Sequence, residues 1–130
     1  MPETWREGVA QNQYQDFGTY PRVLCVCSGG VLRSPTVAWL LCQPPYNRNT
    51  RSAGSHDEYA LIPVDQVLLD WADEVVFVNP ENHKRVKERF KIRGEVYVLP
   101  IPDSFAYRDP RLVDSIRAAL EGVGFPKAQQ

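Results

Sequence analysis

The chain has 130 residues, of which 43% are hydrophobic and 24% charged, a composition typical of one globular domain. Fifteen Lys and Arg residues against sixteen Asp and Glu residues give a formal net charge of −1, which excludes nucleic-acid binding through bulk positive charge. No stretch approaches the roughly 18 apolar residues of a membrane-spanning helix, and the first residues lack the basic and apolar segments of a signal peptide. We therefore expect a soluble, cytoplasmic protein with neither a nucleic-acid nor a membrane partner.

The cysteine content points to thiol chemistry rather than to a disulfide framework. The three cysteines are Cys25, Cys27 and Cys42. An odd, small number without a signal sequence predicts reduced thiols. Their spacing is not that of a zinc site, and the two histidines are isolated, so no metal site is predicted. One well-placed cysteine is then a candidate nucleophile.

The predicted elements alternate along the chain. Residues 1–20 show no clear periodicity and are expected to form an extension packed on a domain that covers residues 21–130. Strands are predicted at 23–26, 50–53, 74–78 and 95–99. Helices are predicted at 34–41, 64–71, 80 to about 90, and from 110 to a stop at Gly122. In the second helix we expect one buried apolar face, formed by Val64, Val67, Leu68 and Trp71.

This alternation predicts an α/β domain with a parallel sheet, helices on both faces and right-handed crossovers. The apolar run at 23–26 has no polar alternation, which is typical of a strand buried on both faces. Ligands of such folds bind beyond the carboxyl ends of the strands. A site is therefore expected after Val26, Ala53, Val78 and Leu99.

The loop after the first predicted strand carries the strongest functional signal. It reads Cys27-Ser-Gly-Gly-Val-Leu-Arg33 and is followed by Ser34-Pro35. Glycines let successive N–H groups point inward as an anion-binding nest, and the following helix N-terminus adds further N–H groups. The Arg33 guanidinium can hold two phosphate oxygens, and these positive surroundings favour the Cys27 thiolate. The loop residues expected to bind the oxyanion are Ser28, Gly29, Gly30, Val31 and Leu32.

Segment 23–35 resembles the phosphate-binding loop of the low-molecular-weight protein tyrosine phosphatases, an apolar strand followed by Cys-x5-Arg-Ser-Pro. Further stretches fit the family in order: Ser52-Ala-Gly54, residues 73–78 and Ile101-Pro-Asp103. The resemblance covers roughly residues 21–121. It implies a three-layer α/β sandwich with a four-stranded parallel sheet in flavodoxin-like strand order. It also implies hydrolysis of phosphotyrosine in proteins, or of small aryl phosphates, without a metal or organic cofactor.

The resemblance implies a role for each catalytic residue. Cys27 attacks phosphorus and forms a phosphocysteine, while Arg33 and the loop amides stabilise the oxygens. Ser34 donates a hydrogen bond to the thiolate. Asp103 protonates the leaving phenolate and then activates water. Asp109 is the rival acid, because Asp109-Pro110 copies an Asp-Pro of many family members, although it fits a helix N-cap and lies farther from the strand.

The chain also departs from the family pattern. Gly30 stands where the family usually has an asparagine that braces the loop, and Ser104 replaces a proline. Leu32 stands where many members have a second loop cysteine, and Cys25 is interpreted as a core residue. Phe105 and Tyr107 are candidates for an aromatic wall around the phosphotyrosine ring.

Two alternatives to the phosphatase remain open. One is a non-catalytic phosphate- or anion-binding module of the same fold. The other is an arsenate reductase, which needs downstream cysteines, and no cysteine follows Cys42. The basic stretch 83–93 is interpreted as a solvated helix face, with steering of an acidic substrate as the sharper hypothesis.

Overall fold

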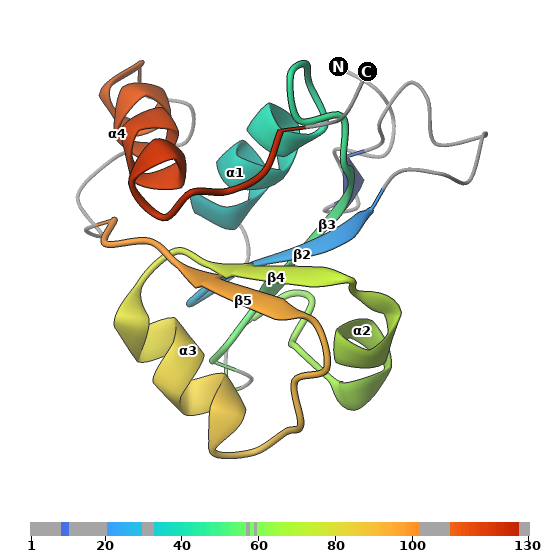
Figure 1. The fold of residues 1–130 in the computed structure, drawn as a ribbon. Helices are drawn as coiled ribbons and strands as arrows, with labels where there is room; N and C mark the ends of the chain where they lie inside the picture. The colour runs from blue at the N-terminus through green and yellow to red at the C-terminus, as the bar shows by residue number, and fades with distance from the viewer. Residues whose placement is uncertain are drawn as a thin grey trace.

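The computed structural model describes residues 9–10, 21–29, 33–56, 58, 60–101 and 110–127 (Figure 1). Its strands are β1 (Val9–Ala10), β2 (Arg22–Cys27), β3 (Asn49–Gly54), β4 (Glu74–Phe77) and β5 (Glu95–Val98). Its helices are α1 (Arg33–Leu41), α2 (Gln66–Trp71), α3 (Pro80–Lys87) and α4 (Pro110–Gly122). From β2 onward strands and helices alternate, which confirms the predicted α/β class.

The sheet has the strand order β1-β3-β2-β4-β5. The strands β3, β2, β4 and β5 are all parallel, so the parallel strands follow the order 2-1-3-4. The short strand β1 pairs antiparallel with β3 at one edge and was not predicted. The two central strands β2 and β4 therefore end side by side, with Val26 opposite Phe77.

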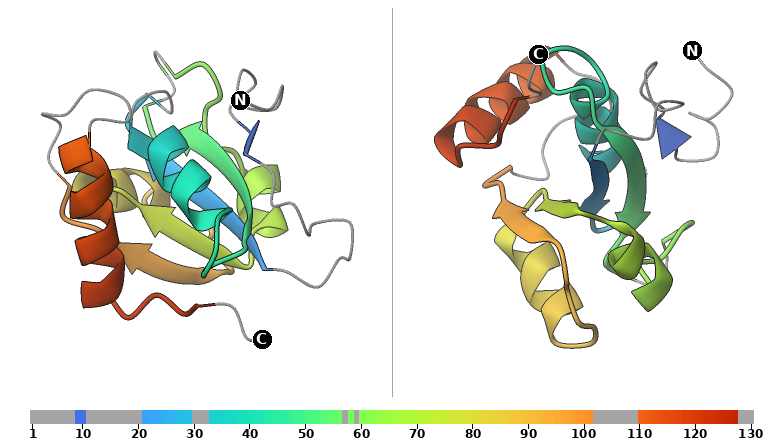
Figure 2. Two further views of the ribbon diagram at one scale, coloured as in Figure 1. Left: turned by 90° about the horizontal axis from the view of Figure 1, so that it is seen from above. Right: turned by 45° about the vertical axis from the view of Figure 1, so that its right-hand side comes forward.

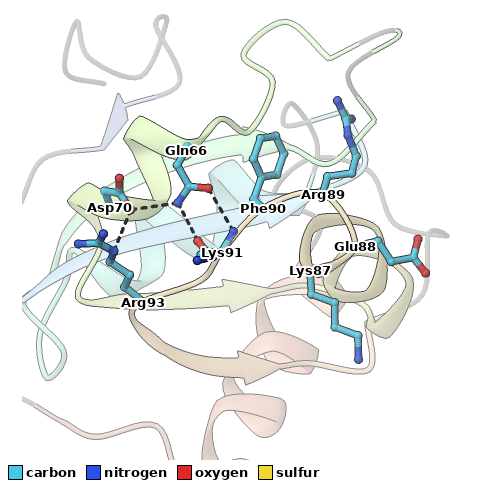
Figure 3. Close-up of a pocket in the computed structure, with 8 residues that line it drawn as sticks. All are labelled: Gln66, Asp70, Lys87, Glu88, Arg89, Phe90, Lys91 and Arg93. Atoms are coloured by element: carbon cyan, nitrogen blue, oxygen red, sulfur yellow. Dashed lines mark hydrogen bonds and ion pairs between the residues drawn. The ribbon is translucent and has the colours of Figure 1, made fainter.

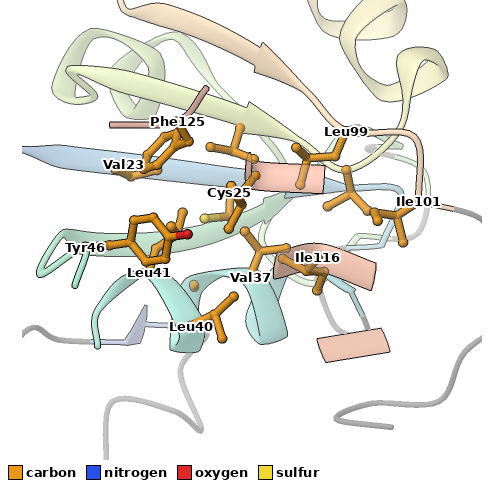
Figure 4. Close-up of a cluster of buried hydrophobic side chains, with 14 of the residues drawn as sticks. Val23, Cys25, Val37, Leu40, Leu41, Tyr46, Leu99, Ile101, Ile116 and Phe125 are labelled. Carbon is orange, nitrogen blue, oxygen red and sulfur yellow. The ribbon is translucent and has the colours of Figure 1, made fainter. Parts of the chain in front are cut away.

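Helices cover both faces of this sheet (Figures 1 and 2). Helices α1 and α4 enclose one core, which includes Cys25, Val37 and Ile116 (Figure 4). Helices α2 and α3 cover a second core, which includes Leu24 and Phe77. Because β2 sends alternate side chains into the two cores, all of its residues after the exposed Arg22 are apolar. Within the described ranges, no helix is long and apolar enough to cross a membrane.

The second helix differs from its prediction. Helix α2 begins at Gln66 because the Asp65 side chain accepts a hydrogen bond from the Leu68 N–H, as an N-cap does. Val64 therefore precedes the helix, and a helical repeat counted from Val64 does not give the face that packs on the sheet. Val67 is 76% exposed, whereas Leu69 is fully buried in the second core. The predicted apolar face is therefore wrong at Val67.

The last two helices begin and end close to the residues predicted from the sequence. Asn79 caps α3 by accepting from the Glu81 N–H, and Pro80 is its first residue, as predicted. Helix α3 ends at Lys87, about three residues earlier than expected. Helix α4 ends at Gly122, but the residue in the left-handed conformation is Gly124, with a φ of 69°. There the Phe125 N–H bonds to the Leu120 carbonyl, which closes the helix end.

Candidate active site

Cys27 lies at the carboxyl end of the central strand β2. Its side chain is only 2% exposed, and Ser34 at the start of α1 is fully buried. Cys27 Sγ and Ser34 Oγ are 3.2 Å apart, a hydrogen-bond distance for sulfur. The structure therefore brings together the two residues that the sequence proposed as nucleophile and thiolate partner. When the thiol loses its proton, the Ser34 hydroxyl is placed to donate to sulfur.

Cys25 is distinct from Cys27 although both face the same core. Burial raises the pKa of the Cys25 thiol well above its ordinary value, and the neighbouring Cys42, Cys27 and Glu74 raise it further. Cys25 therefore stays protonated at neutral pH and is a poor nucleophile. Its full burial confirms the interpretation of Cys25 as a core residue.

The carboxyl end of β3 holds the beginning of the loop through backbone hydrogen bonds. The Ser55 N–H donates to the Cys27 carbonyl at 2.8 Å, and the His56 N–H donates to the Ser28 carbonyl at 3.0 Å. The end of β3 and the loop after β2 approach each other closely here because Gly54 has no side chain. A Cβ at Gly54 would lie 2.7 Å from the Ser28 carbonyl oxygen and 2.8 Å from the Gly29 carbonyl carbon. The Ser-Ala-Gly stretch therefore serves the loop through its glycine.

Asn82, in the first turn of α3, was not among the predicted site residues. Asn82 is 1% exposed, and its Nδ2 donates to Ser28 Oγ at 3.1 Å and to Ser55 Oγ at 3.0 Å. One signal could have identified it. Helix α3 begins just beyond β4, so its first turns lie at the same sheet edge as Cys27. A polar residue there is a candidate for contact with the loop.

The chain leading toward Asp103 also passes this edge. The Leu99 N–H donates to the Phe77 carbonyl at 2.7 Å, and the Ile101 N–H donates to the Val78 carbonyl at 3.0 Å. Ile101 is buried and ends the described part of this segment. Asp103 thus follows two residues after a point fixed beside the carboxyl end of β4.

Several residues that the sequence singled out, as site residues, as the rival acid or as a departure from the family pattern, lie outside the described residues. They are Gly30, Val31, Leu32, Asp103, Ser104, Phe105, Tyr107 and Asp109. Arg33 is described only as the first residue of α1. The roles assigned to these residues stay predictions.

The basic stretch lines a separate cavity of about 500 Å³ between α2 and the segment after α3 (Figure 3). Gln66 closes one side, because its amide bonds to the Lys91 backbone and to Asp70. Arg93 pairs with Asp70 at 3.4 Å, so part of the positive charge is neutralised. The cavity shares no lining residue with the Cys27 site. Among the described residues, no group of three or more His, Cys, Asp or Glu side chains could hold a metal ion.

Comparison with known proteins adds nothing to these observations. No protein-family model matches the chain, and no curated protein or solved structure matches it. Any function must therefore be inferred from the residues themselves and their geometry.

Proposed function

We propose that this chain is a cysteine-dependent phosphomonoester hydrolase of the low-molecular-weight protein tyrosine phosphatase type. The observation that carries the proposal is the 3.2 Å contact between the Cys27 thiol and the Ser34 hydroxyl. The contact lies at the carboxyl end of β2, where a Cys-x5-Arg sequence leads into α1. We infer that the architecture is a flavodoxin-like three-layer sandwich, a fold whose ligands bind at this edge.

In the first step the Cys27 thiolate attacks phosphorus in line with the leaving oxygen. The sulfur–phosphorus bond forms while the bond from phosphorus to the tyrosine oxygen breaks. The protonated Asp103 carboxyl gives its proton to the departing phenolate. Loop amides and the Arg33 guanidinium stabilise the three remaining phosphoryl oxygens.

In the second step water attacks the phosphocysteine. The Asp103 carboxylate accepts the proton of this water, and the phosphorus–sulfur bond breaks to release inorganic phosphate. Ser34 assists by donating a hydrogen bond to the sulfur as it regains negative charge. The cycle needs no metal or cofactor, but it needs a reduced Cys27, so we expect a cytoplasmic enzyme.

The test is hydrolysis of p-nitrophenyl phosphate between pH 5 and 7 in the presence of EDTA. We expect the wild type to turn over and Cys27→Ser to be inactive. Cys42→Ala is the matched control, since this thiol donates to the Trp39 carbonyl and lies in the core. It should keep its activity. A folded wild type without turnover would contradict the proposal and leave a phosphate- or anion-binding module.

The acid is tested with two leaving groups. Loss of a general acid costs roughly 100- to 10,000-fold in rate, and more for a poorer leaving group. Asp103→Asn should therefore slow phenyl phosphate more than p-nitrophenyl phosphate. If Asp109→Asn shows this difference and Asp103→Asn does not, the acid is Asp109.

A further inference from the structure

Asn82 connects α3 to the two chain segments that surround the candidate nucleophile. Its Nδ2 donates one hydrogen to Ser28, the residue after Cys27, and the other to Ser55, the residue after β3. The side chain is 1% exposed, so neither bond competes with bulk water. A single buried amide therefore fixes two loops relative to a helix.

Ser55 is itself held by contacts with other parts of the chain. Its N–H donates to the Cys27 carbonyl, and its own carbonyl accepts from Arg85 Nε at 3.1 Å. Its Oγ lies 3.0 Å from His56 Nδ1. The Ser55 hydroxyl oxygen therefore contacts both the Asn82 amide and the His56 ring. Asn82 thus binds Ser55, which is held in place, and its second hydrogen bond fixes Ser28 relative to Ser55.

The remaining atom of the Asn82 amide indicates why an asparagine stands here. Its Oδ1 is buried, and no group among the described residues donates a hydrogen bond to it. An unpaired buried acceptor costs stability, so folding alone gives little reason to keep it. The two donated hydrogen bonds are the compensating contribution, and both go to residues beside Cys27.

We propose that Asn82 is a positioning residue that holds the Cys27 loop in its anion-binding shape through Ser28 and Ser55. This inference rests on the proposed function. Gly30 has no side chain with which to brace the loop from within. In this protein the brace comes from outside, from the first turns of α3.

The experiment measures how strongly inorganic phosphate protects Cys27 from alkylation by iodoacetamide, with the Cys27 peptide followed by mass spectrometry. Asn82→Ala should weaken protection by about tenfold, the order expected when hydrogen bonds of this kind are lost. Ser28→Ala should weaken it similarly. The double variant should be little worse than Asn82→Ala, because both changes remove the same contact.

Val86→Ala is the matched control for a general weakening of α3. Val86 is 1% exposed and packs in the second core, away from the loop. It should lower the urea midpoint at least as much as Asn82→Ala yet leave phosphate protection within twofold of wild type. A merely structural role for Asn82 predicts that both variants affect protection alike.

The outcomes separate the two proposals. If phosphate protects the wild type and Asn82→Ala equally, the positioning role is overturned and the proposed function stands. The same holds if the effects of Asn82→Ala and Ser28→Ala add fully. If phosphate fails to protect the wild type, the proposed function is contradicted, and the positioning role with it.

Discussion

At the scale of single residues, the contact between the loop and β3 depends on a missing side chain at Gly54. A Cβ there would lie 2.5 Å from the Ala60 Cβ and under 3 Å from backbone atoms of Ser28 and Gly29. Backbone cannot swing aside as a flexible side chain can. We expect Gly54→Ala to lower the free energy of unfolding by about 1–3 kcal/mol, as overpacking does, and to weaken phosphate protection of Cys27.

The control for Gly54→Ala is the same change at Gly122. A Cβ at Gly122 has nothing within 4 Å. Alanine also favours helix over glycine, so Gly122→Ala should leave stability unchanged or slightly higher. Urea denaturation measures both variants. Wild-type stability and phosphate protection in Gly54→Ala would show that the loop does not need this close approach.

At the scale of elements, α3 carries a pH-sensitive contact with β4. The His83 ring lies over the Phe77 ring, with 4.9 Å between centroids. Partial burial lowers the pKa of His83 from its ordinary 6.5, and the Lys87 charge one turn away lowers it further. The unfolded chain therefore binds this proton more readily than the folded protein. Stability should fall as the pH drops below about 6.5, down to the lowered folded value.

The measurement is the urea midpoint at pH 7.5 and at pH 5.5. Glutamine cannot take up the proton, so His83→Gln should remove part of the difference between the two midpoints. The same change at His56 serves as a control for the other histidine. An unchanged pH dependence in His83→Gln would rule out this contribution.

Some elements of the fold could be predicted from the sequence, and others could not. Strand β2 was predictable because its buried part, residues 23–27, is an unbroken apolar run, and α3 because Asn79-Pro80 is a local start signal. Strand β1 was not, since two residues at a sheet edge leave no periodic pattern. The role of Asn82 was also hidden. It depends on a contact with Ser28, 54 positions away, which only the assembled sheet creates.

At the scale of the whole molecule, the candidate active site and a buried ion pair lie at opposite ends of the sheet. Cys27 lies at the carboxyl end of β2, whereas a buried ion pair lies where β4 begins. There Arg48 is 3% exposed and donates to Glu74 Oε1 at 2.7 Å. It also donates to the Tyr46 and Pro126 carbonyls, each at 2.6 Å, which joins the C-terminal segment to the sheet.

Removing one partner of this pair leaves a buried charge uncompensated. Arg48→Met should therefore lower the free energy of unfolding by about 3–5 kcal/mol, as measured by urea denaturation. The exposed pair between Arg22 and Asp73 provides the comparison, with side chains 46% and 50% exposed. Breaking an exposed pair costs at most about 1 kcal/mol, so Arg22→Met should be much milder.

The double variant Arg48→Met, Glu74→Gln separates the effect of the unpaired charge from the effect of losing the Arg48 hydrogen bonds to the Tyr46 and Pro126 carbonyls. Neutralising Glu74 removes the unpaired charge and should recover part of the loss. Recovery should stay incomplete, because the Tyr46 and Pro126 carbonyls still lack their donor. Phosphate protection of Cys27 should be unaffected in the folded double variant, since the pair lies at the opposite end of the strands. Full recovery of stability would mean that Arg48 acts only through its charge, and not by tying the C-terminal segment to the sheet.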